Sequence, residues 1–72
     1  MNIYPNPSLG NFTLSFDDSN QHDIEITNVN GKRLMLFEDI ISGYKLDFTN
    51  FSSGTYLIKV LPENVTYQIV KQ

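Results

Sequence analysis

Cysteine is missing from this chain of 72 residues, so disulfide bonds contribute nothing to its stability. A single histidine is present, and because a structural zinc ion takes four Cys or His ligands, we expect no such site. The longest apolar run is far shorter than the roughly 20 residues that a membrane-spanning helix needs. Residues 1–5 also lack the charged start and long apolar stretch of a secretion signal, so in a longer protein that signal would lie elsewhere.

Positive charge is sparse as well, with five cationic side chains against eight carboxylates and a net charge of -3. The cations are scattered over four segments: Lys32, Arg33, Lys45, Lys59 and Lys71. They form no basic stripe that could follow a phosphate backbone, so we expect no nucleic-acid partner. The length predicts one domain over residues 1–72, and a domain this small buries only about 60% of the surface that it exposes when unfolded.

Short alternating segments, which are typical of β-strands, make up most of the chain. The clearest is residues 55–61, where Tyr56, Ile58 and Val60 share one face and Pro62 ends the run. Further strands are predicted at residues 11–16, 24–27, 32–38, 44–48 and 65–71, with a short edge strand at residues 3–4. No segment has the helical spacing of apolar residues over three turns. Six to seven strands separated by turns predict an all-β fold, a small antiparallel β-sandwich with residues 55–61 at its centre.

The predicted core takes its members from the apolar face of each strand: Phe12, Leu14, Phe16, Ile24, Ile26, Leu34, Leu36, Leu46, Phe48, Phe51, Tyr56, Ile58, Val60, Tyr67 and Ile69. Because Met35 and Phe37 alternate with the leucines in segment 32–38, this strand is apolar on both faces. Either one face contacts a partner or both faces are buried. Leu57, opposite Ile58 in phase, is likewise either covered by a partner or singly exposed. The open sheet edges and this doubly apolar strand also predict that the isolated domain pairs edge to edge.

Few residues suggest catalysis. His22 lies in a polar loop beside Asp23, without a glycine-framed serine anywhere in the chain, and we interpret it as a surface histidine. The adjacent carboxylates at residues 17–18 and 38–39 diverge in turns, and so small a sandwich has little volume for a cleft around them. The acidic loop at residues 17–23 lacks the spacing of a calcium loop, which favours a solvated turn. We therefore expect no enzyme, no metal and no cofactor, but a binding or recognition module.

Several sequence blocks resemble a known family when they are taken together. The residues that carry the resemblance are Tyr4, Pro5, Asn6, Pro7, Gly10, Gly31, Lys32, Gly54, Tyr56 and Lys71. In this order and spacing they make the chain similar to the type IX secretion C-terminal sorting domain, also called the Por secretion tail. Each block alone is weakly specific, but the likeness covers nearly the whole chain.

The resemblance implies an Ig-like sandwich of about seven strands at the C-terminus of a large secreted protein of the Bacteroidetes. Such a tail directs its cargo from the periplasm across the outer membrane, to the medium or the cell surface. Its implied partners are the upstream cargo domain and the type IX secretion machinery, including an outer-membrane shuttle and a sortase that usually removes the tail. The residues named above are the implied sorting motifs, and the usual cleavage site would lie upstream of Met1.

A second interpretation is an Ig-like accessory module of an extracellular enzyme, which binds glycan or acts as a structural spacer. This function predicts an exposed aromatic platform, for which Tyr44 and Tyr67 are the nearest candidates. Both tyrosines also fit positions that pack on the face of a sheet.

Overall fold

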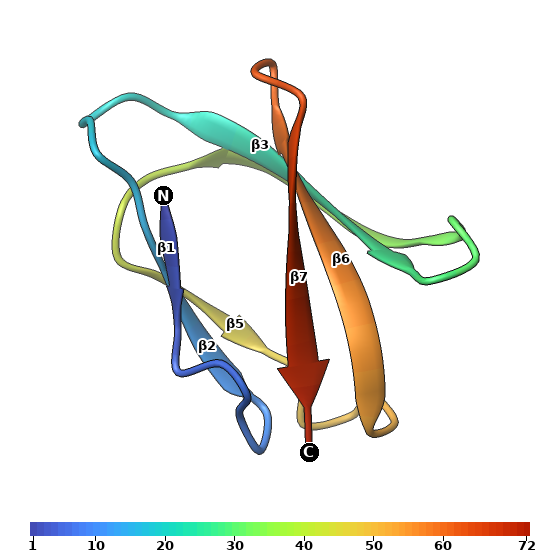
Figure 1. Cartoon of the computed structure of the whole chain (residues 1–72). Coiled ribbons are helices and arrows are strands. Elements are labelled where there is room, and N and C mark those ends of the chain that lie inside the picture. The colour runs from blue at the N-terminus through green and yellow to red at the C-terminus, as the bar shows by residue number, and fades with distance from the viewer.

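The computed structural model describes residues 1–72 and consists of strands, turns and loops (Figure 1). The seven strands are β1 (Asn2–Tyr4), β2 (Asn11–Ser15), β3 (His22–Asn28), β4 (Arg33–Ile40), β5 (Tyr44–Asp47), β6 (Gly54–Leu61) and β7 (Val65–Lys71). They form two antiparallel sheets, ordered β1-β2-β5 and β4-β3-β6-β7. This arrangement confirms the predicted all-β, Ig-like sandwich. No helix in it is long and apolar enough to cross a membrane.

All the predicted strands are present, and their bounds differ from the expected ones by a few residues at most. The strand that contains Tyr56, Ile58 and Val60 is β6, and it pairs with β3 on one side and β7 on the other. It is therefore an interior strand of the larger sheet, as predicted. β1 is short because Pro5 follows it at once, and a proline cannot donate the next hydrogen bond of the ladder.

The core lies between the two sheets, where the alternating apolar residues of both inner faces meet. Its fully buried members are Phe12, Leu14, Ile24, Ile26, Leu46, Phe48, Ile58 and Ile69, and Phe16, Ile40, Tyr56 and Val60 are nearly so. Leu34, Phe51 and Tyr67 are half-buried and pack against this cluster. The sequence-based core omits Ile40, which is the last residue of β4 and lies opposite His22.

The predicted role of Leu36 in the core is wrong. Met35 and Phe37 lie opposite the inward-facing residues of β3 and pack against the core, whereas Leu36 lies opposite the outward-facing Glu25 and is 43% exposed. The reason is the irregular pairing of β4, whose register against β3 shifts twice. Each shift changes which residues face inward, so strict two-residue alternation does not hold along this strand. The alternative that both faces are buried holds only in part, because Leu34, Met35 and Phe37 pack against the core and Leu36 is exposed.

The sandwich has two ends, which differ in what closes them. At one end lie the segment between β1 and β2, the turn between β5 and β6, and the C-terminus, and we call this end the elbow pole (Figure 1). At the other end lie the β2–β3 loop, the β4–β5 turn and the β6–β7 turn, and we call it the opposite pole. The long axis of the molecule measures 31 Å.

Candidate functional site

The elbow pole is built around residues 5–10, which connect β1 to β2 but reach across to the edge of the other sheet. The Asn6 side chain amide donates to the Gln68 carbonyl at 3.1 Å, and its oxygen accepts from the Val70 N–H at 3.0 Å. Pro5 and Pro7 on either side have no N–H to offer. The amide of Asn6 therefore replaces a main-chain pair and covers the C-terminal half of β7 as an added strand would.

Ser8 continues this pairing and is a key residue that the sequence analysis missed. Its N–H donates to the Val70 carbonyl at 3.1 Å, and its carbonyl accepts from the Gln72 N–H at 2.8 Å. Its hydroxyl donates to the Asn11 carbonyl at 2.6 Å and accepts from the N–H groups of Gly10 and Asn11. A serine followed by Leu-Gly is a signal for such a turn, because its hydroxyl can bond backbone groups two and three residues later. The buried Ser8 thus fixes the elbow to the C-terminal strand.

Gly10 holds the elbow against the β5–β6 turn. Its carbonyl accepts from the Phe48 N–H at 2.7 Å. A Cβ at this position would lie 3.0 Å from Thr49 Cγ2 and 3.3 Å from Thr49 Cα, which is closer than side chains normally pack. Glycine is required here by the close approach of the two segments.

Lys71 is buried between the sheets at the same pole. Its ammonium group donates to the carbonyls of Thr49, at 3.2 Å, and Phe51. Hydrogen bonds from the Thr49 hydroxyl and N–H, with a smaller contribution from the nearby Lys71 charge, lower the pKa of Asp47. Lys71, one of the residues that carry the family resemblance, is therefore a structural group that ties β7 to the β5–β6 turn.

Tyr56 fills the core at this pole and bonds the β5–β6 turn. It is buried, packs against Phe48 and Phe51, and its hydroxyl donates to the Ser52 carbonyl at 2.6 Å. A tyrosine early in this strand that bonds the backbone a few residues upstream is the tyrosine corner of Ig-like sandwiches. Gly54, two residues earlier, begins β6 opposite Lys71.

The remaining predicted site residues lie apart from this group. Gly31 and Lys32 are exposed at the β3–β4 hairpin, which extends away from the elbow in Figure 1. There the Asn28 side chain oxygen accepts from the N–H groups of Asn30 and Lys32, at 2.9 and 3.0 Å, and fixes the turn. Tyr4 ends β1 with half of its surface exposed, at 51%. The structure thus brings five of the predicted residues together at the elbow pole: Asn6, Gly10, Gly54, Tyr56 and Lys71. Tyr4 and the hairpin residues Gly31 and Lys32 lie elsewhere on the surface.

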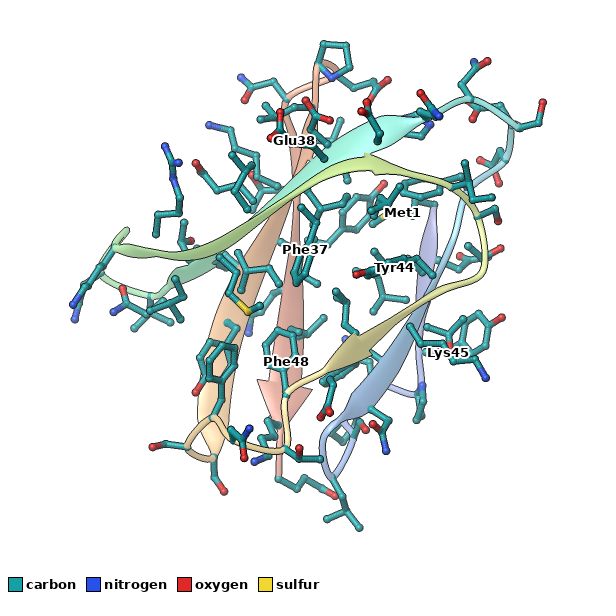
Figure 2. The ribbon with its side chains drawn as sticks, turned by 180° about the vertical axis from the view of Figure 1, so that it is seen from behind. Met1, Phe37, Glu38, Tyr44, Lys45 and Phe48 are labelled. Carbon is teal, nitrogen blue, oxygen red and sulfur yellow. The ribbon has the colours of Figure 1, made fainter.

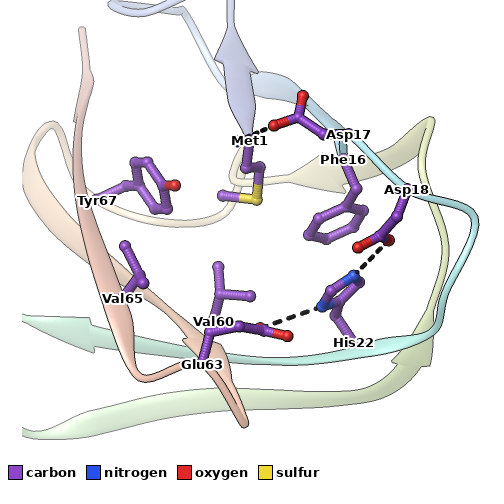
Figure 3. Close-up of a pocket in the computed structure, with 9 residues that line it drawn as sticks. All are labelled: Met1, Phe16, Asp17, Asp18, His22, Val60, Glu63, Val65 and Tyr67. Carbon is purple, nitrogen blue, oxygen red and sulfur yellow. Dashed lines mark hydrogen bonds and ion pairs between the residues drawn. The ribbon is translucent and has the colours of Figure 1, made fainter.

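His22 corrects the interpretation of a surface histidine. It is the first residue of β3, only 7% of its surface is exposed, and its ring stacks on Phe16 with a centroid distance of 4.2 Å. Nε2 lies 2.9 Å from Asp18 Oδ1, and Nδ1 lies 3.2 Å from Glu63 Oε2 (Figure 3). When the ring is protonated, both nitrogens donate, one to each carboxylate. The hydrogen bond to Asp18 and then that to Glu63 raise the pKa of His22, and the bond from His22 lowers the pKa of Asp18.

The three side chains tie the β2–β3 loop to the β6–β7 turn and border a small open pocket of about 150 Å³. Its other walls are mainly apolar, with Met1, Val60 and Tyr67 around the space in Figure 3. No group of three or more His, Cys, Asp or Glu side chains is placed to hold a metal ion. Both nitrogens of His22 are engaged by carboxylates, so its geometry is that of an ion-paired structural group.

The aromatic platform expected for a glycan-binding module does not form from the two tyrosines proposed for it. Tyr44 is half-buried and lies against Phe37, with ring centroids 5.6 Å apart. Figure 2 shows both rings between the ribbons of the two sheets. Tyr67 is half-buried at the pocket near His22.

These features define a class of protein: a small Ig-like domain with a tyrosine corner, whose C-terminal strand is fastened by an N-terminal elbow and a buried lysine. A sequence model of one such family, the secretion system C-terminal sorting domain, matches residues 2–72, and this chain belongs to that family. It is a sorting signal of type IX secretion, and such tails mark proteins exported through the outer membrane to the medium or cell surface.

A characterised relative carries a similar segment. The chain is 34% identical over 68 residues to ulvan lyase NLR42 of Nonlabens ulvanivorans, a species of the Bacteroidetes. The match covers 92% of this chain but only 13% of the lyase. Because sorting tails act on the protein to which they are attached, the partners of this domain include an upstream cargo and the type IX secretion machinery.

Proposed function

We propose that residues 1–72 are the C-terminal domain of a larger secreted protein and serve it as an address label without catalysis of their own. The observation that supports this proposal is the use of the family's motif residues at the elbow pole. Asn6, Gly10, Tyr56 and Lys71 all make contacts that complete the fold, and none of them borders the pocket at His22. These residues act by holding the pole in shape.

The exposed motif residues are then the ones that contact the secretion machinery, including its outer-membrane shuttle. Tyr4 and Lys32 present an aromatic ring and a cation without intramolecular side-chain partners, and Pro5, Pro7 and Gly31 are exposed beside them. The prolines fix the backbone beside Tyr4, so that this segment binds a partner with little loss of backbone conformational entropy. Motif residues that make contacts at the elbow pole provide the shape, and exposed ones without such contacts bind the partner.

A secretion assay tests this function. The chain is fused to the C-terminus of a periplasmic reporter in a host with type IX secretion, and reporter activity is measured in the medium and on the cell surface. We expect export of the fusion and periplasmic retention of the reporter alone. Retention of both would refute the proposal, and glycan binding by the purified domain would then support the accessory-module alternative.

Substitutions separate shape from contact. Tyr4→Ser and Lys32→Ser leave the folded domain intact, because neither side chain is buried, and we expect each to reduce export several-fold. Asn2→Ser, at an exposed position of the same strand as Tyr4, is the matched control and keeps full export. If the two variants and the control are exported equally, the exposed residues make no contact with the machinery.

Removal by a sortase and association of two copies are parts of the same proposal. If a sortase removes the tail, the exported reporter loses the mass of this domain, and intact mass spectrometry of the medium detects that loss. An exported reporter of full fusion mass would contradict the cleavage. Edge-to-edge association of two copies involves the edge of β4, for the reasons that follow.

A further inference from the structure

The edge of β4 is the one long sheet edge without a cover. β1 and β5 are short edge strands of three and four residues, and the elbow covers half of β7. β4 has eight residues, and from Arg33 to Glu38 no hydrogen bond reaches its free side from another segment. A row of free N–H and C=O groups of this kind can accept another strand.

The side chains of β4 are arranged symmetrically about Leu36. Arg33 lies three residues before it and its guanidinium Nε is 3.0 Å from Glu25, on the outer face of the sheet. Asp39 lies three residues after it, and its N–H donates to the side chain of the outward-facing Asp23 at 3.0 Å. One register shift places Arg33, opposite Thr27, on the same outer face as Leu36, and the other places Asp39 beside the outward-facing Asp23.

We propose that two copies of this domain associate through antiparallel pairing of their β4 strands about a two-fold axis at Leu36, a register that deepens the self-association proposed above. In this register Arg33 of each copy lies opposite Asp39 of the other, and Leu36 meets its own equivalent. On the inner face Met35 lies opposite Phe37. The two four-stranded sheets become one continuous sheet, and the interface is isologous.

Charge and apolar contact select this register over its neighbours. A shift by two residues in one direction places Arg33 opposite Phe37, and in the other direction it places Met35 opposite Asp39. Of these three registers, only the proposed one pairs opposite charges at both ends, with the apolar pairs of Met35 with Phe37 and of the two Leu36 residues at its centre. In the proposed register the pairing of Leu34 with Glu38 contributes no favourable contact, and the register shifts at both ends of β4 keep the interface short. The dimer is therefore weak, and because charge pairs hold its ends, its affinity falls with salt.

The inner face of β4 has apolar surface that is only half-buried and that a second copy can cover. The sheet that contains β4 has four strands and the facing sheet has three, so Met35 and Phe37 are only partly covered from within. In Figure 2 Phe37 points toward the facing sheet, whereas Glu38 points away from the core. Pairing at β4 removes more of this apolar surface from water.

Sedimentation velocity of the purified domain, from roughly ten micromolar to one millimolar, measures the association. We expect a concentration-dependent monomer–dimer equilibrium whose dissociation constant rises with salt. Leu36→Lys places two like charges at the two-fold axis and raises the dissociation constant at least tenfold. Gln68→Lys, an exposed change on the outer face of the far edge strand, is the matched control and has no such effect.

Charge reversal tests the register itself. Arg33→Asp and Asp39→Lys each place like charges opposite each other in their own homodimers, so each variant alone is monomeric. An equimolar mixture restores both opposite-charge pairs in the heterodimer and therefore associates. Because Asp39 has a positive φ of 58°, a position that lysine tolerates less well, a melting curve verifies that Asp39→Lys is folded.

A wild-type domain that stays monomeric up to the highest concentration would overturn the proposal. A dimer that survives Arg33→Asp and Leu36→Lys unchanged, or variants that do not associate when mixed, would overturn the register. These measurements use the isolated domain and no secretion apparatus. A reporter that fails to be exported therefore refutes the sorting role without affecting them, and a strict monomer leaves the sorting role in place.

Discussion

Removal of a single oxygen atom, by Tyr56→Phe, tests the role of the tyrosine corner. The phenol of Tyr56 is the only group that bonds the Ser52 carbonyl, at 2.6 Å, and it thereby fixes the turn that carries the chain from one sheet to the other. The substitution keeps the ring and its contacts with Phe48 and Phe51. The turn loses its hydrogen bond and the core loses no apolar volume.

The size of the effect follows from these contacts. A neutral hydrogen bond contributes a net stabilisation of about 0.5–1.5 kcal/mol. Ser52 is an exposed residue, so water can reach its carbonyl in the variant and the full penalty of a buried unpaired acceptor does not apply. We therefore expect the free energy of unfolding to fall by about 1 kcal/mol, which for a domain of this size lowers the Tm by roughly 4–8 °C.

Urea unfolding followed by circular dichroism measures this change. We expect a lower midpoint with an unchanged slope, because the surface exposed on unfolding is the same. Tyr67→Phe is the control: Tyr67 is also half-buried against the core, but its hydroxyl makes no hydrogen bond within the protein, so its midpoint stays at the wild-type value. Equal midpoints for the wild type and Tyr56→Phe, or an equal loss in both variants, would refute the role assigned to the corner.

Three further changes test the other contacts. The raised pKa of His22 and the lowered pKa of Asp18 predict that their stabilisation is complete between about pH 4 and 6.5, is lost above that range as the ring deprotonates, and below it as the carboxylate protonates. When the free energy of unfolding is measured against pH, we expect the His22→Gln variant to lack the loss of stability above about pH 6.5. A loss that persists in the variant would contradict the assignment of this loss to His22. Lys71→Met keeps the aliphatic stem but removes the bonds to two carbonyls, so we expect a loss of about 1.5–3 kcal/mol. The same change at Lys59, which bonds no carbonyl, costs far less, and equal losses would exclude the proposed role. Asn6→Ala loses two exposed hydrogen bonds, about 1–2 kcal/mol in total, and amide exchange at Val70 accelerates unless the elbow is held by other contacts.

The strands were predictable because each is a local pattern. Residues such as Ile24 and Ile26 alternate with polar neighbours, and this alternation alone sets their face in the sheet. Leu36 escaped the prediction because a register shift depends on the partner strand and leaves no mark in the alternation itself. The irregular strand that misled the core prediction is also the one that provides the open edge.

The candidate site could be located in the sequence but not explained from it. Asn6 and its two flanking prolines were identified as motif residues, whereas the hydrogen bonds of Asn6 reach residues 62 and 64 positions away. His22 was misjudged for the same reason, since its partner Glu63 is 41 positions away in another turn. Local composition indicates a polar loop, and only the fold shows that the loop closes over the histidine.

The long-range bonds of the elbow have a consequence for the way in which the chain is made. Asn6 and Ser8 are synthesised before Gln68, Val70 and Gln72, the residues to which they bond. A nascent or truncated polypeptide that stops before Gln68 therefore lacks the edge on which the elbow settles, and also lacks the lysine that seals the core. Only a polypeptide that includes residues up to Gln72 can display the finished pole, so the geometry distinguishes chains that contain β7 from chains that stop before it.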